Sequence, residues 1–216
     1  MNERGLDTSA ALILAVQALV IAVLLGGATA VMLPVTAQIG GGILIAMVDA
    51  GSATVVLLAF AAACRVAAIA WRGPVVRWIE WSQVSAITVF LVAQLNGIQD
   101  IAALVALYAL TAGASLFLVL HEATPQERWP YRFGAALGIV PWGVIAFYQI
   151  AGMLSGSAPD TVVRIITLSM LVLAGLYWVC MLRTRSSYRV HLVLMVASTA
   201  IFAWMTLVLS LAHSQA

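Results

Sequence analysis

The sequence predicts an all-α protein, a bundle of seven helices that cross a membrane. Of its 216 residues, 64% are hydrophobic and only 8% are charged, and the mean hydropathy is +1.09. Soluble domains carry about 25% charged residues, so this composition excludes an ordinary soluble domain. It also excludes a nucleic-acid-binding protein, because the chain has no basic stripe and no soluble domain to carry one. The expected partner is the lipid bilayer, and the sequence names no protein partner.

Seven apolar runs are long enough to cross a bilayer, which takes roughly 20 apolar residues. Proline, glycine and polar residues separate these runs, and the polar connections are short. We therefore expect a single seven-helix transmembrane domain over residues 1–216. The expected spans are 10–33, 41–64, 78–97, 100–120, 133–153, 161–182 and 190–212.

The N-terminal segment has a second interpretation. Residues 1–30 resemble a secretory signal peptide, because Arg4 precedes an apolar stretch that ends at Ala28-Thr29-Ala30. This stretch is longer than the 7–15 residues usual for such a signal, which favours a membrane span.

The arginines predict the orientation of the bundle. With seven spans, nine of the ten basic residues fall on the side of the N-terminus, and only Arg164 falls on the other. By the positive-inside rule, we expect a protein integral to the cell membrane with a cytoplasmic N-terminus and an extracellular C-terminus. The nine are Arg4, Arg65, Arg72, Arg77, Arg128, Arg132, Arg183, Arg185 and Arg189.

The segment RWIEWS, residues 77–82, places Glu80 between two tryptophans at the start of a long uncharged run. A charge inside a span is costly and usually functional. Arg77, three residues earlier on the same helix face, is the expected partner of Glu80. Two interpretations stay open: an Arg77–Glu80 pair that completes the helix end, or a carboxylate that serves a functional site.

The same segment resembles the third helix of heliorhodopsins, a family of microbial rhodopsins. In the similar family pattern, the carboxylate matching Glu80 is the counterion of a protonated retinal Schiff base. Further resemblance lies in LNGIQDIAALVALYAL, in FGAALGIVPWGVIAFY (133–148) and in YRVHLVLMVASTAIFAW (188–204). The resemblance covers residues 72–211 well and the first two helices weakly. It implies a rhodopsin-like fold, a cytoplasmic N-terminus and a homodimer.

One departure from the family decides the cofactor. The family's seventh helix carries a lysine in a string similar to VAKTA, whereas this chain reads VASTA, with Ser198 at the lysine position. The chain contains no lysine, since all ten basic residues are arginines. A hydroxyl cannot form a Schiff base, and a guanidinium stays protonated. We therefore expect no covalent cofactor, and retinal enters only as a noncovalent ligand.

The resemblance also implies where a ligand pocket would lie, between the third, fifth, sixth and seventh helices. Core packing is the alternative role for its bulky members. The candidate pocket residues are Glu80, Trp81, Ser85, Pro141, Trp142, Ser198, Phe202 and Trp204.

Other positions carry weaker expectations. The first connection, residues 34–40, is shorter than its family counterpart, and two family histidines are absent, with Leu14 and the Cys64-Arg65 region in their places. Asp49, expected inside the second span, either lines a wet cavity or bonds a neighbouring helix. The motif at 134–138, Gly-x-x-x-Gly, permits a close helix contact. The three histidines, His121, His191 and His213, are expected at the membrane interface.

The chain lacks the sequence motifs of metalloproteases, serine hydrolases and phosphate-binding loops, so we expect neither an enzyme nor a metal site. Three roles stay open. The favoured one is a light-independent receptor-like, regulatory or scaffold protein. The second is a noncovalent binder of retinal or another apolar ligand. The third is a transporter of ions or small solutes past Asp49, Glu80, Gln83 and Gln94.

Overall fold

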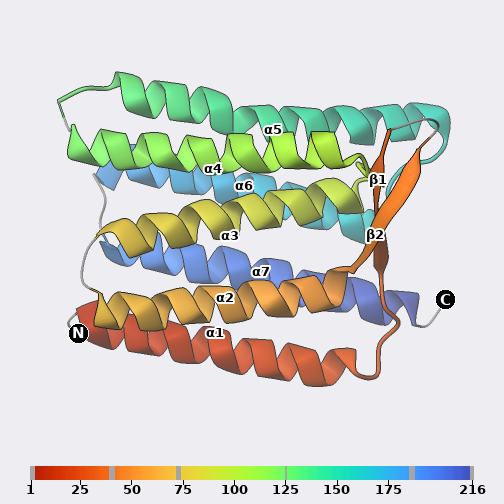
Figure 1. Cartoon of the computed structure of the whole chain (residues 1–216), viewed down its shortest axis with the longest axis horizontal. Coiled ribbons are helices and arrows are strands. Elements are labelled where there is room, and N and C mark those ends of the chain that lie inside the picture. The colour runs from red at the N-terminus through yellow and green to blue at the C-terminus, as the bar shows by residue number, and fades with distance from the viewer. Residues whose placement is uncertain (1–2, 39–41, 72–73, 125, 185–187, 215–216) are drawn as a thin grey trace.

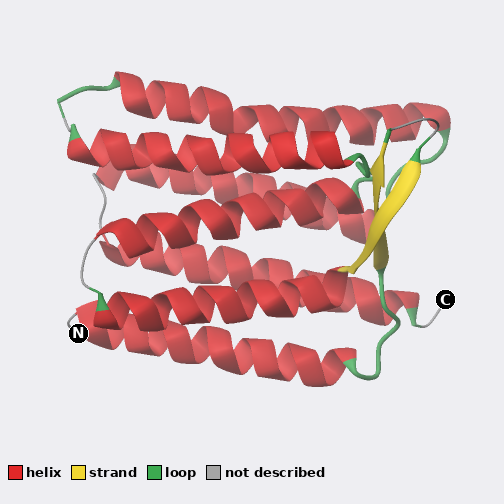
Figure 2. Ribbon diagram, in the orientation of Figure 1, coloured by secondary structure: helices red, strands yellow, loops and turns green. Residues whose placement is uncertain are grey.

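The computed structural model describes residues 3–38, 42–71, 74–124, 126–184 and 188–214. Within these ranges, seven helices are long and apolar enough to cross a membrane, which confirms the predicted fold class (Figure 1). A two-stranded antiparallel sheet accompanies them (Figure 2). The elements in chain order are α1 (Glu3–Leu25), β1 (Met32–Ala37), β2 (Ile43–Asp49), α2 (Ala50–Ala70), α3 (Pro74–Leu95), α4 (Ile101–Ala123), α5 (Trp129–Ser155), α6 (Thr161–Thr184) and α7 (Tyr188–His213).

Helix α3 lies at the centre of the bundle. It contacts α2, α4, α5, α6 and α7, and half of its apolar window is buried, against 11% for the peripheral helix α5. The chain begins at one end of the bundle, and the sheet and the C-terminus lie at the other (Figure 1). Side chains on α3 can therefore meet partners from most of the other helices.

The first two predicted spans, 10–33 and 41–64, each overlap a membrane-spanning helix, but their bounds are wrong. The structure ends α1 at Leu25 and begins α2 at Ala50, and the segment 26–49 between them includes both strands. Hydropathy assigned parts of this segment to spans because an apolar strand and an apolar helix are equally hydrophobic. In β1 the residues Leu33, Val35 and Ala37 alternate inward, which is the period of a strand. The first connection is consequently long rather than short.

Asp49 has a different role from either one expected. It is the N-cap of α2, where its carboxylate accepts hydrogen bonds from the backbone N–H of Ser52 at 2.9 Å and from the Ser52 hydroxyl at 2.6 Å. Burial raises the pKa of Asp49, but the hydrogen bonds from Ser52 and nearby backbone groups outweigh it and leave that pKa below its usual value. Asp49 thus fixes the start of α2.

The glycine motif at 134–138 is used inside the bundle. A Cβ atom placed on Gly134 would lie 2.8 Å from Cβ of Phe117 on α4 and 2.9 Å from Cη2 of Trp178 on α6. The missing side chain therefore lets α5 approach α4 while Trp178 fits against both helices.

Gly134→Ala should destabilise the protein by about 1–3 kcal/mol, because the added methyl group overpacks the contact between α4, α5 and α6. Gly143→Ala on the same helix is the matched control, since a Cβ there meets no atom within 4 Å. Thermal unfolding in detergent micelles measures both changes. Equal stabilities of the two variants would contradict the close approach at Gly134.

Candidate functional site

A buried ionic cluster joins α1, α2, α3 and α7 near the end of the bundle where the chain begins. Its centre is Arg65 on α2, whose side chain has 0% exposure. Arg65 Nε donates to Glu80 Oε1 at 2.8 Å, and Arg65 Nη2 forms an ion pair with Glu80 Oε2. Arg65 Nη1 donates to Asp7 Oδ1 at 3.1 Å and to the Tyr188 hydroxyl oxygen at 3.3 Å, and that hydroxyl donates to Asp7. One guanidinium thus serves two carboxylates.

The expected pairing of Arg77 with Glu80 is wrong. Arg77 Nη2 instead contacts the Glu122 carboxylate on α4, at 2.6 Å and 2.5 Å, and the Trp78 indole N–H donates to Glu122 at 2.6 Å. Glu80 points into the bundle, whereas Arg77 lies near its rim. The spacing rule within one helix could not anticipate this, because both partners come from neighbouring helices.

Arg65 was expected in the connection between the second and third helices, but it lies within α2. Helix α2 continues to Ala70, so Arg65 lies more than one turn inside the helix. A guanidinium and a carboxylate in a forked, two-bond arrangement form one of the stronger pairings available to proteins. That geometry offsets the large cost of removing both charges from water. The positive charge that Glu80 needs therefore comes from a side chain of the protein, Arg65.

An aromatic layer lies next to the cluster. Trp81 stacks on Tyr177 of α6 with ring centres 3.7 Å apart, and the Tyr177 hydroxyl lies 2.9 Å from His191 Nδ1 on α7. The expectation that His191 is interfacial is wrong, because it is 1% exposed and contacts Trp78 and Trp81 edge-on. His191 lies within one turn of Tyr188 on α7, so it belongs to the inner face of that helix. The other two histidines do lie near helix ends.

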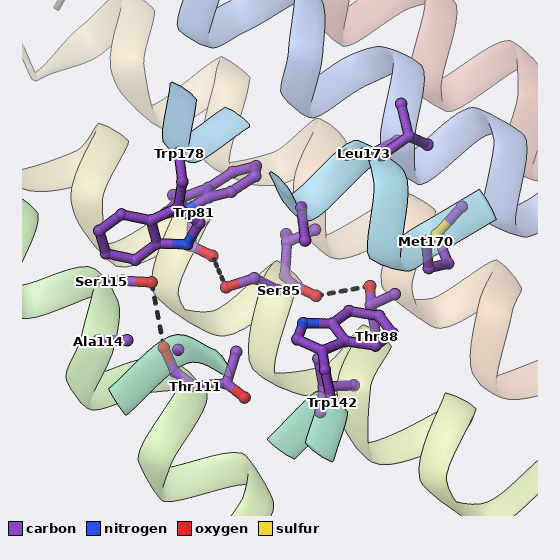
Figure 3. Close-up of a pocket in the computed structure, with 15 residues that line it drawn as sticks. Trp81, Ser85, Thr88, Thr111, Ala114, Ser115, Trp142, Met170, Leu173 and Trp178 are labelled. Atoms are coloured by element: carbon purple, nitrogen blue, oxygen red, sulfur yellow. Dashed lines mark hydrogen bonds between the residues drawn. The ribbon is translucent and has the colours of Figure 1, made fainter. Parts of the chain in front are cut away.

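Trp81 belongs both to this layer and to the lining of an apolar pocket between α3, α4, α5, α6 and α7 (Figure 3). The cavity has a volume of about 70 Å³. Trp81, Trp142 and Trp178 supply its largest aromatic surfaces, and Ser198 of α7 also lies on its wall. The remaining polar lining consists of hydroxyls: Ser85, Thr88, Thr111 and Ser115.

With this geometry established, comparison with known proteins identifies the family. The family model described as Heliorhodopsin matches residues 53–211 of the chain. The chain belongs to the heliorhodopsin family. A search of curated proteins finds no match to it. Heliorhodopsins generally bind retinal and generally sense light, so the fit of retinal to this member is the next question.

Covalent retinal does not fit the residues of this heliorhodopsin. The chain has no lysine, and the residue of α7 on the pocket wall is Ser198, whose hydroxyl donates to the Met195 carbonyl at 3.0 Å. The cavity of about 70 Å³ is also smaller than the ~150 Å³ that accepts benzene in an engineered protein core. The pocket therefore offers no amine for a Schiff base, and its cavity is too small for retinal.

The structure brings four of the eight candidate pocket residues together around one cavity: Trp81, Ser85, Trp142 and Ser198. The other four lie elsewhere. Glu80 is in the ionic cluster, Pro141 and Phe202 are buried in the bundle, and Trp204 is 41% exposed at its surface.

Sequence reasoning missed the contribution of α4 to the pocket. Thr111 and Ser115 are spaced by one helical turn in a mostly apolar helix, and this spacing was the available signal. It also missed Trp178 of α6 and the inward direction of Arg65. No pattern within one helix could have shown that Asp7, Arg65 and Glu80 converge.

A double-mutant cycle tests the ionic cluster. Arg65→Gln should destabilise the protein by about 3–5 kcal/mol, because it leaves the Glu80 carboxylate buried without its cation. Adding Glu80→Gln should recover a large part of that loss. Unfolding of each variant in detergent gives the coupling free energy.

The matched control is the cycle of Arg77 with Glu80, which should give a coupling near zero because these two side chains pair with other residues. A coupling between Arg77 and Glu80 that exceeds the coupling between Arg65 and Glu80 would contradict the cluster.

Proposed function

We propose that this heliorhodopsin acts in the membrane without light, as a receptor-like, regulatory or scaffold protein. The observation that carries the proposal is the buried pair of Arg65 and Glu80. In the family pattern, the matching carboxylate faces the protonated Schiff base that retinal forms with a lysine. Here a guanidinium, which stays protonated in proteins, supplies the positive charge permanently. The positive charge that faces Glu80 is therefore independent of any bound molecule.

The contacts of the polar residues argue against a transport path. Of the four polar residues named for a transport path, Glu80 is held by Arg65, Asp49 caps α2, and Gln83 accepts a hydrogen bond from the Tyr108 hydroxyl. The fourth, Gln94, is buried, and its side chain has no hydrogen-bond partner among the described residues. A carboxylate held in a forked ion pair is poorly suited to bind and release a passing ion. We propose neither transport nor an enzymatic activity.

A second candidate function rests on the pocket. Three tryptophans from α3, α5 and α6 surround it, and no charged side chain lies among the described residues that line it. A concave, mainly apolar site with a few polar groups is the usual form of a small-molecule site. We propose that this pocket binds a small apolar molecule noncovalently, and that such binding is the input of the receptor-like role.

We also propose a cytoplasmic N-terminus and an extracellular C-terminus. The N-terminus and the connections after α2, α4 and α6 share one end of the bundle (Figure 1). The exposed arginines Arg4, Arg128, Arg132 and Arg189 belong to that end, whereas Arg164 belongs to the other. Arg65 no longer contributes to this argument because it is buried, and Arg72 and Arg185 lie outside the described residues. The homodimer implied by the family resemblance remains part of the proposal.

A topology reporter tests the orientation. An enzyme that is active only outside the cytoplasm, fused after Ala216, should be active in cells, and the same enzyme fused at the N-terminus should be inactive. The excess of arginine at the N-terminal end is the physical reason. The reverse pattern of activity would contradict the proposed orientation.

A reconstitution experiment tests independence from light. The protein purified with added all-trans retinal should show no visible absorption band, because retinal without a protonated Schiff base absorbs in the near ultraviolet. A lysine-bearing heliorhodopsin treated in parallel is the positive control. The proposal fails if the wild-type protein acquires a visible band that hydroxylamine bleaches.

A further inference from the structure

The hydroxyl groups that line the pocket already donate hydrogen bonds within the protein. Each one donates to a main-chain carbonyl three or four residues earlier in its own helix, and this bond leaves the hydroxyl oxygen able to accept another. The donations run from Ser85 to Trp81 at 2.6 Å, from Thr88 to Val84 at 2.7 Å, from Thr111 to Leu107 at 2.9 Å, from Ser115 to Thr111 at 3.2 Å and from Ser198 to Met195 at 3.0 Å.

The three tryptophans that line the pocket carry indole N–H groups, which can only donate. Trp81, Trp142 and Trp178 each bring one, and among the described residues none of these three groups donates to another side chain or carbonyl. Figure 3 shows these three rings around Ser85 and Thr88. The pocket therefore combines hydroxyl oxygens that accept with indole groups that donate, and its described lining includes no charge.

We infer that the pocket selects a neutral apolar alcohol over the matching aldehyde or carboxylate. A ligand hydroxyl can donate to a serine or threonine oxygen and accept from an indole N–H, so it satisfies both kinds of group. An aldehyde only accepts, which leaves the hydroxyl oxygens without a donor. A carboxylate would be buried without a cation, which is costly. This inference rests on the second proposed function, the pocket as a binding site.

The size of the cavity limits the ligand. A water molecule needs ~10–15 Å³ of such space, and ~150 Å³ accepts benzene. About 70 Å³ lies between these values, so the cavity fits a hydroxyl and the few carbons next to it. Small probes are therefore the right ones: 1-propanol, propanal and propionate share one carbon skeleton and differ only in the polar group.

The experiment titrates these three probes into the full chain in lipid nanodiscs and follows tryptophan fluorescence and thermal stability. Wild-type protein should bind 1-propanol about threefold to tenfold more tightly than propanal, which is the ordinary worth of one hydrogen bond, and should not bind propionate. Because the chain has no lysine, propanal cannot bind through a lysine Schiff base.

Two variants separate the ligand class from the pocket itself. Thr111→Val removes an accepting oxygen at nearly constant shape and should reduce the preference for the alcohol. Thr8→Val is the matched control, because Thr8 makes the same type of bond to its own helix, to Arg4, far from the pocket. Gly138→Leu fills the cavity and should abolish binding of both neutral probes, since Gly138 lies on its wall with Trp178 3.4 Å from the added Cβ.

The outcomes are distinguishable. Equal binding of propanol and propanal that Gly138→Leu abolishes would overturn the alcohol preference and leave the pocket as a binding site. Binding that persists unchanged in Gly138→Leu would overturn the pocket itself. Tight binding of propionate would overturn the inference that the pocket is built for neutral molecules.

Discussion

The structure depends on one electrostatic constraint: the carboxylate of Glu80 is buried, and a buried charge needs a partner. Removing an isolated carboxylate from water costs far more than a protein domain's whole stability, so such a group is either neutralised or paired. Arg65 meets this need with a forked contact from α2 and extends it to Asp7 and Tyr188. Four helices are thereby held together at one end of the bundle.

The pairing orders what surrounds it. Next to the charges, Trp81 and Tyr177 stack, and His191 completes an aromatic layer. Beyond Trp81 comes a pocket whose lining residues carry no charge. The inner residues of α3 therefore run from an ionic cluster through an aromatic layer to an uncharged cavity. In this chain without lysine, the cation that Glu80 requires is Arg65 of α2, outside the pocket.

The sequence anticipated the features that depend on composition or on spacing within one helix. Helices α3 to α7 form close to their predicted spans because long apolar runs and turn residues mark them; Gly97, for example, takes a φ of 87° in the turn after α3. Hydropathy failed between α1 and α2 because it does not distinguish an apolar strand from an apolar helix. The Arg65–Glu80 contact was not predicted because charges fifteen residues apart on different helices leave no periodic signal in the sequence. His191 was misplaced because nearness to a helix end in sequence was taken for nearness to water.

The most direct test of the central claim is the protonation state of Glu80. Infrared spectra of the wild-type protein and of Glu80→Gln, recorded under the same conditions, differ by the absorption of this one carboxyl group. If Arg65 is its buried cation, the difference spectrum at neutral pH should show the loss of an ionised carboxylate band. Loss of a protonated carboxylic acid band would instead mean that Glu80 is neutral, and the account built on its pairing with Arg65 would be wrong.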